Sequence, residues 1–189
     1  MKKVFIIHGF EGKPNGGWRP WFMRELEKLD VYACALPMPT PDLPQRDEWV
    51  AEIIRHFPAD RRDMHLVGHS LGVPAILRAL QMQPSASQFG GIHLVSGPCE
   101  RNANPASESF KKLGSFFADP FDFALIRSQA QKFGVIHGDN DAMVPVEHAH
   151  SLAAALACEL TLVPQGGHLN GSSGFYELPV LLEKFKNSL

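Results

Sequence analysis

Residues 64–80, MHLVGHSLGVPAILRAL, constrain the fold more than any other stretch of this sequence. Residues 64–67 are a short apolar run typical of a buried strand, and residues 73–80 carry apolar side chains at helical spacing. Between them, without a linker, lie residues 68–72, GHSLG, a G-x-S-x-G pentapeptide. The pattern therefore predicts a strand, a sharp turn and a helix, with Ser70 exposed on the turn.

The residues around Ser70 suit such a turn. Gly68 and Gly72 have no Cβ atom, so the strand and the helix can approach the serine closely. Pro74 falls in the first helical turn, where its missing N–H breaks no intrahelical hydrogen bond. The N-terminus of the helix supplies unpaired N–H groups for a developing negative charge. A chance Gly-Ser-Gly turn is the alternative, and the strand and helix on either side argue against it.

The composition is that of an ordinary globular protein. Its 189 residues fit one domain, 1–189, and 44% of them are hydrophobic and 20% charged. The formal net charge is −2 and no run of Lys or Arg exceeds two residues. We therefore expect neither nucleic acid nor a membrane surface as a partner, and the sequence names no protein partner.

Cysteine usage indicates the compartment. Cys34, Cys99 and Cys158 are odd in number and widely spaced, with no C-x-x-C motif. This usage predicts free thiols in a reducing compartment, without a catalytic role. The apolar run 4–7 is too short for a signal peptide, and no 18-residue apolar run occurs. A cytoplasmic location is the expectation.

Six short apolar stretches alternate with helical patterns along the chain. They predict a three-layer α/β fold: a mainly parallel sheet of about six strands, helices on both faces and no large lid. The predicted strands are residues 3–8, 31–36, 64–67, 90–96, 133–137 and 159–163. Because ligands bind at the carboxyl ends of the strands in such sheets, we expect the functional residues along that edge.

Three residues that follow predicted strands form a candidate catalytic triad. A serine becomes nucleophilic when an imidazole takes its proton and a carboxylate orients that imidazole. Ser70, Asp141 and His168 supply these groups in the chain order typical of G-x-S-x-G enzymes. Of nine histidines, His168 alone follows the last strand through a Gly-Gly pair. Asp139 competes with Asp141, but Asp141 lies deeper in its turn and is favoured, with Asp139 capping that turn.

Backbone N–H groups are the candidates for stabilising a negatively charged intermediate. Leu71, directly after Ser70, supplies one predicted donor. The second comes from the loop after the first strand, where Phe10 is the candidate and Glu11 the next choice.

The sequence predicts neither an organic cofactor nor a metal. The glycine-rich residues 9–17 match neither of the common phosphate-binding patterns. His148 and His150 are two positions apart on a predicted helix, which puts them on different faces.

Aromatic residues give the candidate substrate pocket: Trp18 near the start of a predicted helix, and Phe117 and Phe121 in a Phe-rich segment. Core packing is an equally good interpretation for Trp18. Residues 99–132, which hold the Phe-rich segment, form either a small cap over the site or the packing face of short helices, and packing is slightly favoured.

Three motifs together resemble a known family: GHSLG at 68–72, GDNDAMVP at 138–145 and GGH at 166–168 look like the α/β-hydrolase superfamily. The small size, the absence of a hairpin before the first strand, and FFADPFDF at 116–123 resemble one branch more narrowly. That branch is the compact serine hydrolases related to retinoblastoma-binding protein nine and the bacterial YdeN-type proteins.

The resemblance implies Ser70 as nucleophile, Asp141 as acid and His168 as base, on a lidless sheet with an esterase-like activity. We expect a serine hydrolase that cleaves small carboxylic esters through an acyl-enzyme, with no metal or cofactor. Acyl-peptide, thioester and amide substrates stay open. The competing hypothesis is a protein- or ligand-binding module on a hydrolase scaffold, whose hydrolysis is incidental.

Overall fold

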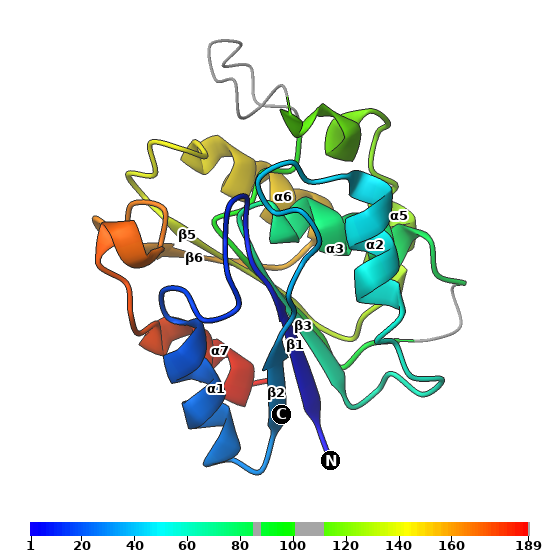
Figure 1. Ribbon diagram of the computed structural model, residues 1–189, viewed down its shortest axis with the longest axis horizontal. Helices are drawn as coiled ribbons and strands as arrows, with labels where there is room; N and C mark the ends of the chain where they lie inside the picture. Colours follow the sequence, from blue (N-terminus) through cyan, green and yellow to red (C-terminus); the bar gives the residue numbers. More distant parts are fainter. Residues whose placement is uncertain (85–87, 101–111, 189) are drawn as a thin grey trace.

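The computed structural model describes residues 1–84, 88–100 and 112–188. Within these residues, six strands form one sheet in the order β2-β1-β3-β4-β5-β6, and all neighbouring strands are parallel (Figure 1). The strands are β1 Lys3–Ile7, β2 Tyr32–Ala35, β3 Met64–His69, β4 Gly91–Val95, β5 Phe133–Gly138 and β6 Glu159–Val163. The predicted α/β fold is confirmed, and its sheet is parallel throughout.

Helices cover both faces of the sheet (Figure 1). α1 and α7 pack on one face, and α2, α3, α5 and α6 lie on the other. Their bounds are α1 Arg19–Glu27, α2 Arg46–Ile54, α3 Gly72–Gln81, α5 Phe123–Ser128, α6 Val146–Leu156 and α7 Pro179–Lys186. No helix in the described part of the chain is both long and apolar enough to cross a membrane.

The central strands bury both of their faces. In β1, Val4 and Ile6 face the apolar layer beneath α1 and α7, whereas Phe5 and Ile7 face the layer beneath α2 and α3. Because both layers exclude water, such a strand is a continuous apolar run instead of an alternating pattern. The inner strands were recognisable in the sequence for this reason.

Helix α3 begins in close contact with the sheet because two glycines leave room for it. A Cβ atom at Gly72 would lie 2.3 Å from the carbonyl oxygen of Ile7. A Cβ atom at Gly68 would lie 2.9 Å from the Ile76 side chain and 3.0 Å from the backbone of Gly72. Both glycines of the G-x-S-x-G pentapeptide are therefore required by close packing around the turn.

Where it is described, the Phe-rich segment packs against the helices α2 and α3. Phe116, in the short 3-10 helix Gly114–Phe117, is fully buried, and its ring lies edge-on to Trp49 at 5.9 Å. The segment 99–132 was predicted to be a cap or a packing face. Its described part packs, and residues 101–111 lie outside the described residues.

Arg78 of α3 holds the chain that follows this 3-10 helix. Its guanidinium donates hydrogen bonds to the carbonyl groups of Phe116, Asp119 and Pro120. The same guanidinium lies over the ring of Phe121, 3.8 Å from the ring centre. One buried cation thus fixes three carbonyl groups between Phe116 and Pro120 and one aromatic ring.

Two strand histidines form part of the core beneath α7. The rings of His65 in β3 and His93 in β4 lie 5.0 and 5.9 Å from the ring of Phe185. Burial lowers the pKa of His93 to about 3, and the neighbouring His65 adds to this effect. Burial likewise lowers the pKa of His65 to about 4. Both imidazoles are therefore neutral in the folded protein at neutral pH.

This burial predicts a loss of stability in acid. An imidazole in the unfolded chain titrates near pH 6.5, so acidification protonates the unfolded chain first and the free energy of unfolding falls as the pH falls. With a folded pKa of about 3, His93 alone should lower that free energy by about 2 kcal/mol between pH 7.5 and pH 5. Urea unfolding at both pH values should show this excess loss in the wild type relative to His93→Gln. Equal losses in the two proteins would contradict the assignment.

Candidate active site

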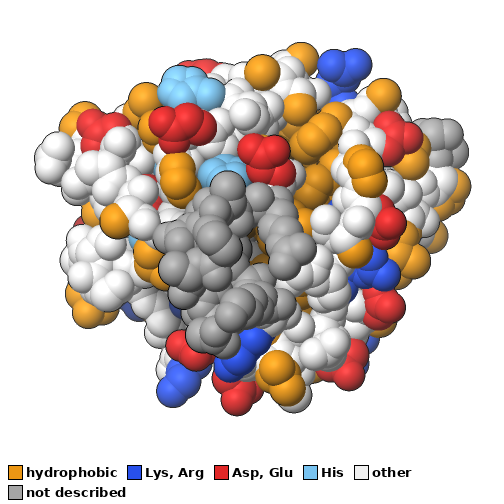
Figure 2. Space-filling model, turned by 90° about the horizontal axis from the view of Figure 1, so that it is seen from above, with side chains coloured by type: hydrophobic (Ala, Val, Ile, Leu, Met, Phe, Trp, Pro, Cys, Tyr) orange, Lys and Arg blue, Asp and Glu red, His pale blue; other side chains and the backbone are white. Residues whose placement is uncertain are grey.

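Ser70 lies at the carboxyl end of β3, on the turn into α3. Its φ angle is 54°, in the left-handed region that only glycine adopts without strain, and its N–H donates to the Val95 carbonyl at 2.9 Å. A Cβ atom at Gly9 would lie 2.7 Å from the Ser70 Cβ, so the loop after β1 also passes next to this serine. Figure 2 shows histidine and acidic side chains next to one another on the face at this edge of the sheet.

His168 and Asp141, two residues of the predicted triad, are hydrogen-bonded to each other. His168 Nδ1 lies 2.8 Å from Asp141 Oδ2, and both side chains are buried. Because a carboxylate accepts, His168 Nδ1 donates, and Nε2 remains as the nitrogen that can take a proton. The other carboxylate oxygen of Asp141 accepts from the N–H groups of Met143 at 2.8 Å and Val144 at 3.0 Å. The buried negative charge is thus well supplied with donors.

The Ser70 hydroxyl is half-buried, and no hydrogen bond joins it to His168 in this structure. The two residues nevertheless belong to adjoining turns, since the ring of His69 bonds to the carbonyl oxygen of His168 at 2.9 Å. A serine–histidine hydrogen bond is often long before a substrate binds. The His69 ring therefore links the residue before Ser70 to the loop that carries His168.

His137, for which the sequence predicted no role, also lies next to Asp141. Its Nε2 donates to the Val144 carbonyl at 2.9 Å and lies 3.4 Å from Asp141 Oδ2. Burial lowers the pKa of His137, so it is a neutral donor to the turn that holds Asp141. In the sequence, the position of His137 at the end of a predicted strand, just before Asp139 and Asp141, was the feature that could have indicated this contact.

Asp139 serves a different purpose from Asp141. Its Oδ1 accepts from the N–H of Gln165 at 2.8 Å, and the next residue, Asn140, accepts from the N–H of Gly167 at 2.7 Å. Three consecutive side chains after β5 therefore hold successive parts of the loop that carries His168. This geometry favours Asp141 over Asp139 as the partner of the imidazole.

The two predicted oxyanion donors have free N–H groups. Within the described residues, neither the Phe10 N–H nor the Leu71 N–H has a hydrogen-bond acceptor. The N–H of Glu11, the second choice, donates to the Pro41 carbonyl at 2.7 Å and is occupied. The carbonyl of Gly9 accepts hydrogen bonds from His8 Nδ1 at 2.8 Å and from the N–H of Gly12 at 3.0 Å. The peptide that carries the Phe10 N–H is thus held at its opposite end.

The predicted pocket residues are placed differently. Trp18 is fully buried and its indole N–H donates to the Leu169 carbonyl at 2.9 Å, so it supports the His168 loop from within the core. Phe117 and Phe121 are half-buried and pack edge-on to each other at 6.4 Å against the core. Core packing, the alternative for these aromatic residues, describes them better.

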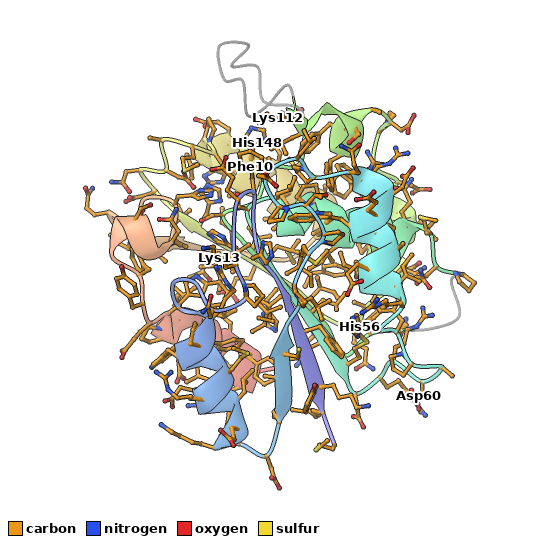
Figure 3. All side chains as sticks on the ribbon, in the orientation of Figure 1. Phe10, Lys13, His56, Asp60, Lys112 and His148 are labelled. Carbon is orange, nitrogen blue, oxygen red and sulfur yellow. The ribbon has the colours of Figure 1, made fainter. Side chains whose placement is uncertain are left out.

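Other side chains lie near the same edge of the sheet. The ammonium group of Lys112 lies 6.0 Å from the ring centre of Phe10, and Figure 3 shows both residues with His148 at the carboxyl ends of the strands. Burial raises the pKa of the Cys99 thiol, which contacts His148, to about 11, so this thiol is a poor nucleophile.

The other end of the sheet carries a separate hollow of about 150 Å³, between the starts of β5 and β6 and the end of α7. None of the predicted site residues lines it. Within the described residues, no group of three or more His, Cys, Asp or Glu side chains could hold a metal ion.

Comparison with known proteins places this chain in a family. The family model described as serine hydrolase matches residues 4–187. The chain belongs to the serine hydrolase family. This serine hydrolase is 33% identical over 182 residues to the putative hydrolase YdeN of Bacillus subtilis, covering 96% of this chain and 93% of that protein.

Solved structures agree with this membership. The crystal structure of the ydeN gene product from B. subtilis matches with a TM-score of 0.93 and 31% identity, over 100% of this chain and 98% of that chain. A carboxylesterase structure from the Thaumarchaeon Nitrososphaera gargenis matches with a TM-score of 0.71, at 12% identity, over 98% and 90% of the two chains. The second likeness concerns the fold alone. The predicted resemblance to the α/β-hydrolase superfamily is confirmed, and the chain is a hydrolase.

Proposed function

We propose that this serine hydrolase cleaves small carboxylic esters through an acyl-enzyme, with Ser70 as nucleophile, His168 as base and Asp141 as acid. The observation that carries the proposal is the buried hydrogen bond of 2.8 Å between His168 Nδ1 and Asp141 Oδ2, beside a serine held at a φ of 54°. This combination presents a hydroxyl group and an unprotonated imidazole nitrogen at one edge of the sheet.

The first half of the reaction forms the acyl-enzyme. Ser70 Oγ attacks the ester carbonyl carbon while its proton passes to His168 Nε2. The carbonyl oxygen becomes an oxyanion, which accepts hydrogen bonds from the free N–H groups of Leu71 and Phe10. When the intermediate collapses, the bond to the alcohol breaks and His168 returns the proton to the leaving oxygen.

The second half releases the acid. A water molecule gives a proton to His168 Nε2 and attacks the acyl carbon, and Ser70 leaves as the protonated hydroxyl. Throughout, the negative charge of Asp141 stabilises the imidazolium that forms twice in each turnover. The donors from Met143 and Val144 keep that carboxylate in place.

The substrate class and the setting are part of the proposal. The likeness to a carboxylesterase supports an ester, while thioesters, amides and acyl-peptides use the same steps. Cys34, Cys99 and Cys158 are free thiols, which supports a cytoplasmic location. We also propose that residues 1–189 act as one domain.

Labelling with a fluorophosphonate probe tests the nucleophile. The wild type should be labelled, because the probe reacts only with an activated serine, whereas Ser70→Ala and His168→Ala should not react. Peptide mass mapping should place the label on Ser70. An unlabelled but folded wild type would contradict the proposal and favour the binding-module hypothesis.

Paired substitutions test the acid. Asp141→Asn removes the charge that orients His168, and kcat for an ester such as p-nitrophenyl acetate should fall by roughly 10³ to 10⁴. Asp139→Asn is the matched control, because it changes a carboxylate two positions away whose hydrogen-bond partner among the described residues is the backbone N–H of Gln165. Its loss should be less than about tenfold. Equal losses in the two variants would show that the acid is wrongly assigned.

A further inference from the structure

The loop that carries His168 has an unfavourable backbone conformation. Gly167 and Leu169, on either side of the histidine, have φ angles of 52° and 47°. Glycine adopts such an angle freely, but for leucine it is strained and persists only when surrounding contacts hold it. The contacts that hold this loop therefore determine where the imidazole lies.

Two aromatic N–H groups bind consecutive carbonyl oxygens of the loop. His69 Nε2 lies 2.9 Å from the carbonyl oxygen of His168, and Trp18 Nε1 donates to that of Leu169 at 2.9 Å. A carbonyl oxygen only accepts, so His69 carries its proton on Nε2. The donors come from β3 and from the start of α1, far from the loop in sequence.

The two donors support each other. Both side chains are buried, and their rings meet edge-on at 6.1 Å. The ring of His69 also lies 5.0 Å from the ring of His168. Burial holds the pKa of His69 well below its ordinary value. A second cation therefore does not form beside the imidazolium that His168 becomes during the reaction.

We propose that Trp18 and His69 are positioning residues that hold the strained His168 loop against the Ser70 turn. His69 precedes Ser70 directly, so the hydrogen bond from its ring ties the residue before the nucleophile to the backbone of the base. Without the two donors, two buried carbonyl groups lose their partners and the loop relaxes, moving His168 away from Ser70. This role rests on the proposed function, and it adds two residues that touch no substrate.

Matched substitutions test the role of His69. His69→Gln keeps a donor at the position of Nε2, whereas His69→Met has a similar length and no donor. For hydrolysis of p-nitrophenyl acetate, kcat of His69→Met should fall by about 10- to 100-fold, because small displacements of catalytic groups are costly. KM should stay within about threefold, and His69→Gln should recover most of the loss. Unchanged kcat in His69→Met, or an equal loss in His69→Gln, would overturn the proposal.

Trp18→Phe removes the other donor and keeps a ring in the core. Its kcat should also fall by about tenfold or more, and the double variant with His69→Met should lose less than the product of the two effects, because both changes release one loop. Phe185→Leu controls for lost packing: it is fully buried in the same apolar layer and has no polar contact with the loop. If Phe185→Leu, at a similar melting temperature, loses as much kcat as Trp18→Phe, the effect is general packing. If His69→Met does not fold, the comparison of kcat between Trp18→Phe and Phe185→Leu tests the proposal.

A spectroscopic measurement separates this proposal from the proposed function. The proton between His168 Nδ1 and Asp141 should give a low-field NMR signal that needs no turnover. The signal should persist in His69→Gln and be lost to exchange with water in His69→Met and Trp18→Phe. A wild type that shows the signal but neither labels nor hydrolyses esters would overturn the proposed function alone. A signal equally strong in all variants would overturn the positioning role alone.

Discussion

The site depends on one buried hydrogen bond, between the imidazole of His168 and the carboxylate of Asp141. A carboxylate buried in a protein is costly unless several donors surround it. Here the backbone N–H groups of Met143 and Val144 and the ring of His168 donate to it, and His137 Nε2 lies 3.4 Å away. The side chains of neighbouring Asp139 and Asn140 accept hydrogen bonds from backbone N–H groups of the loop that carries His168. Three consecutive residues after β5 therefore include the proposed acid and hold the loop of the proposed base.

Close backbone contacts bring the remaining parts together. A Cβ atom at Gly138 would lie 2.1 Å from the carbonyl oxygen of Gly167, so the acid turn and the base loop touch with no side chain between them. Gly72 allows α3 to touch the end of β1 in the same way. The loop after β1 and the loop that carries His168 both contact the end of β3, through Gly9 and Ser70 and through His168 and His69. The contacts at Gly72 and Gly138 both need glycine, because a side chain at either position would clash with the neighbouring backbone.

The sequence predicted what depends on local pattern. The G-x-S-x-G turn and the six strands follow from residues close together in the chain, and the preference for Asp141 over Asp139 stays a prediction. The sequence could not predict that the Glu11 N–H is occupied, because its acceptor, Pro41, belongs to a different loop. Trp18 was a candidate pocket residue for the same reason: its acceptor lies 151 residues away. Aromatic side chains near a predicted site do not show, from sequence alone, whether they face substrate or the core.

Three buried histidines around the site each hold a loop by a hydrogen bond to its backbone, and burial keeps them uncharged. The rings of His8, His69 and His137 each donate to a backbone carbonyl: one in the Phe10 loop, one in the His168 loop and one in the Asp141 turn. Burial lowers the pKa of all three, so they remain neutral donors. A lysine or arginine could donate equally well, but its charge would oppose the formation of an imidazolium nearby. Neutral rings fix the loops and leave Asp141 as the charge closest to His168.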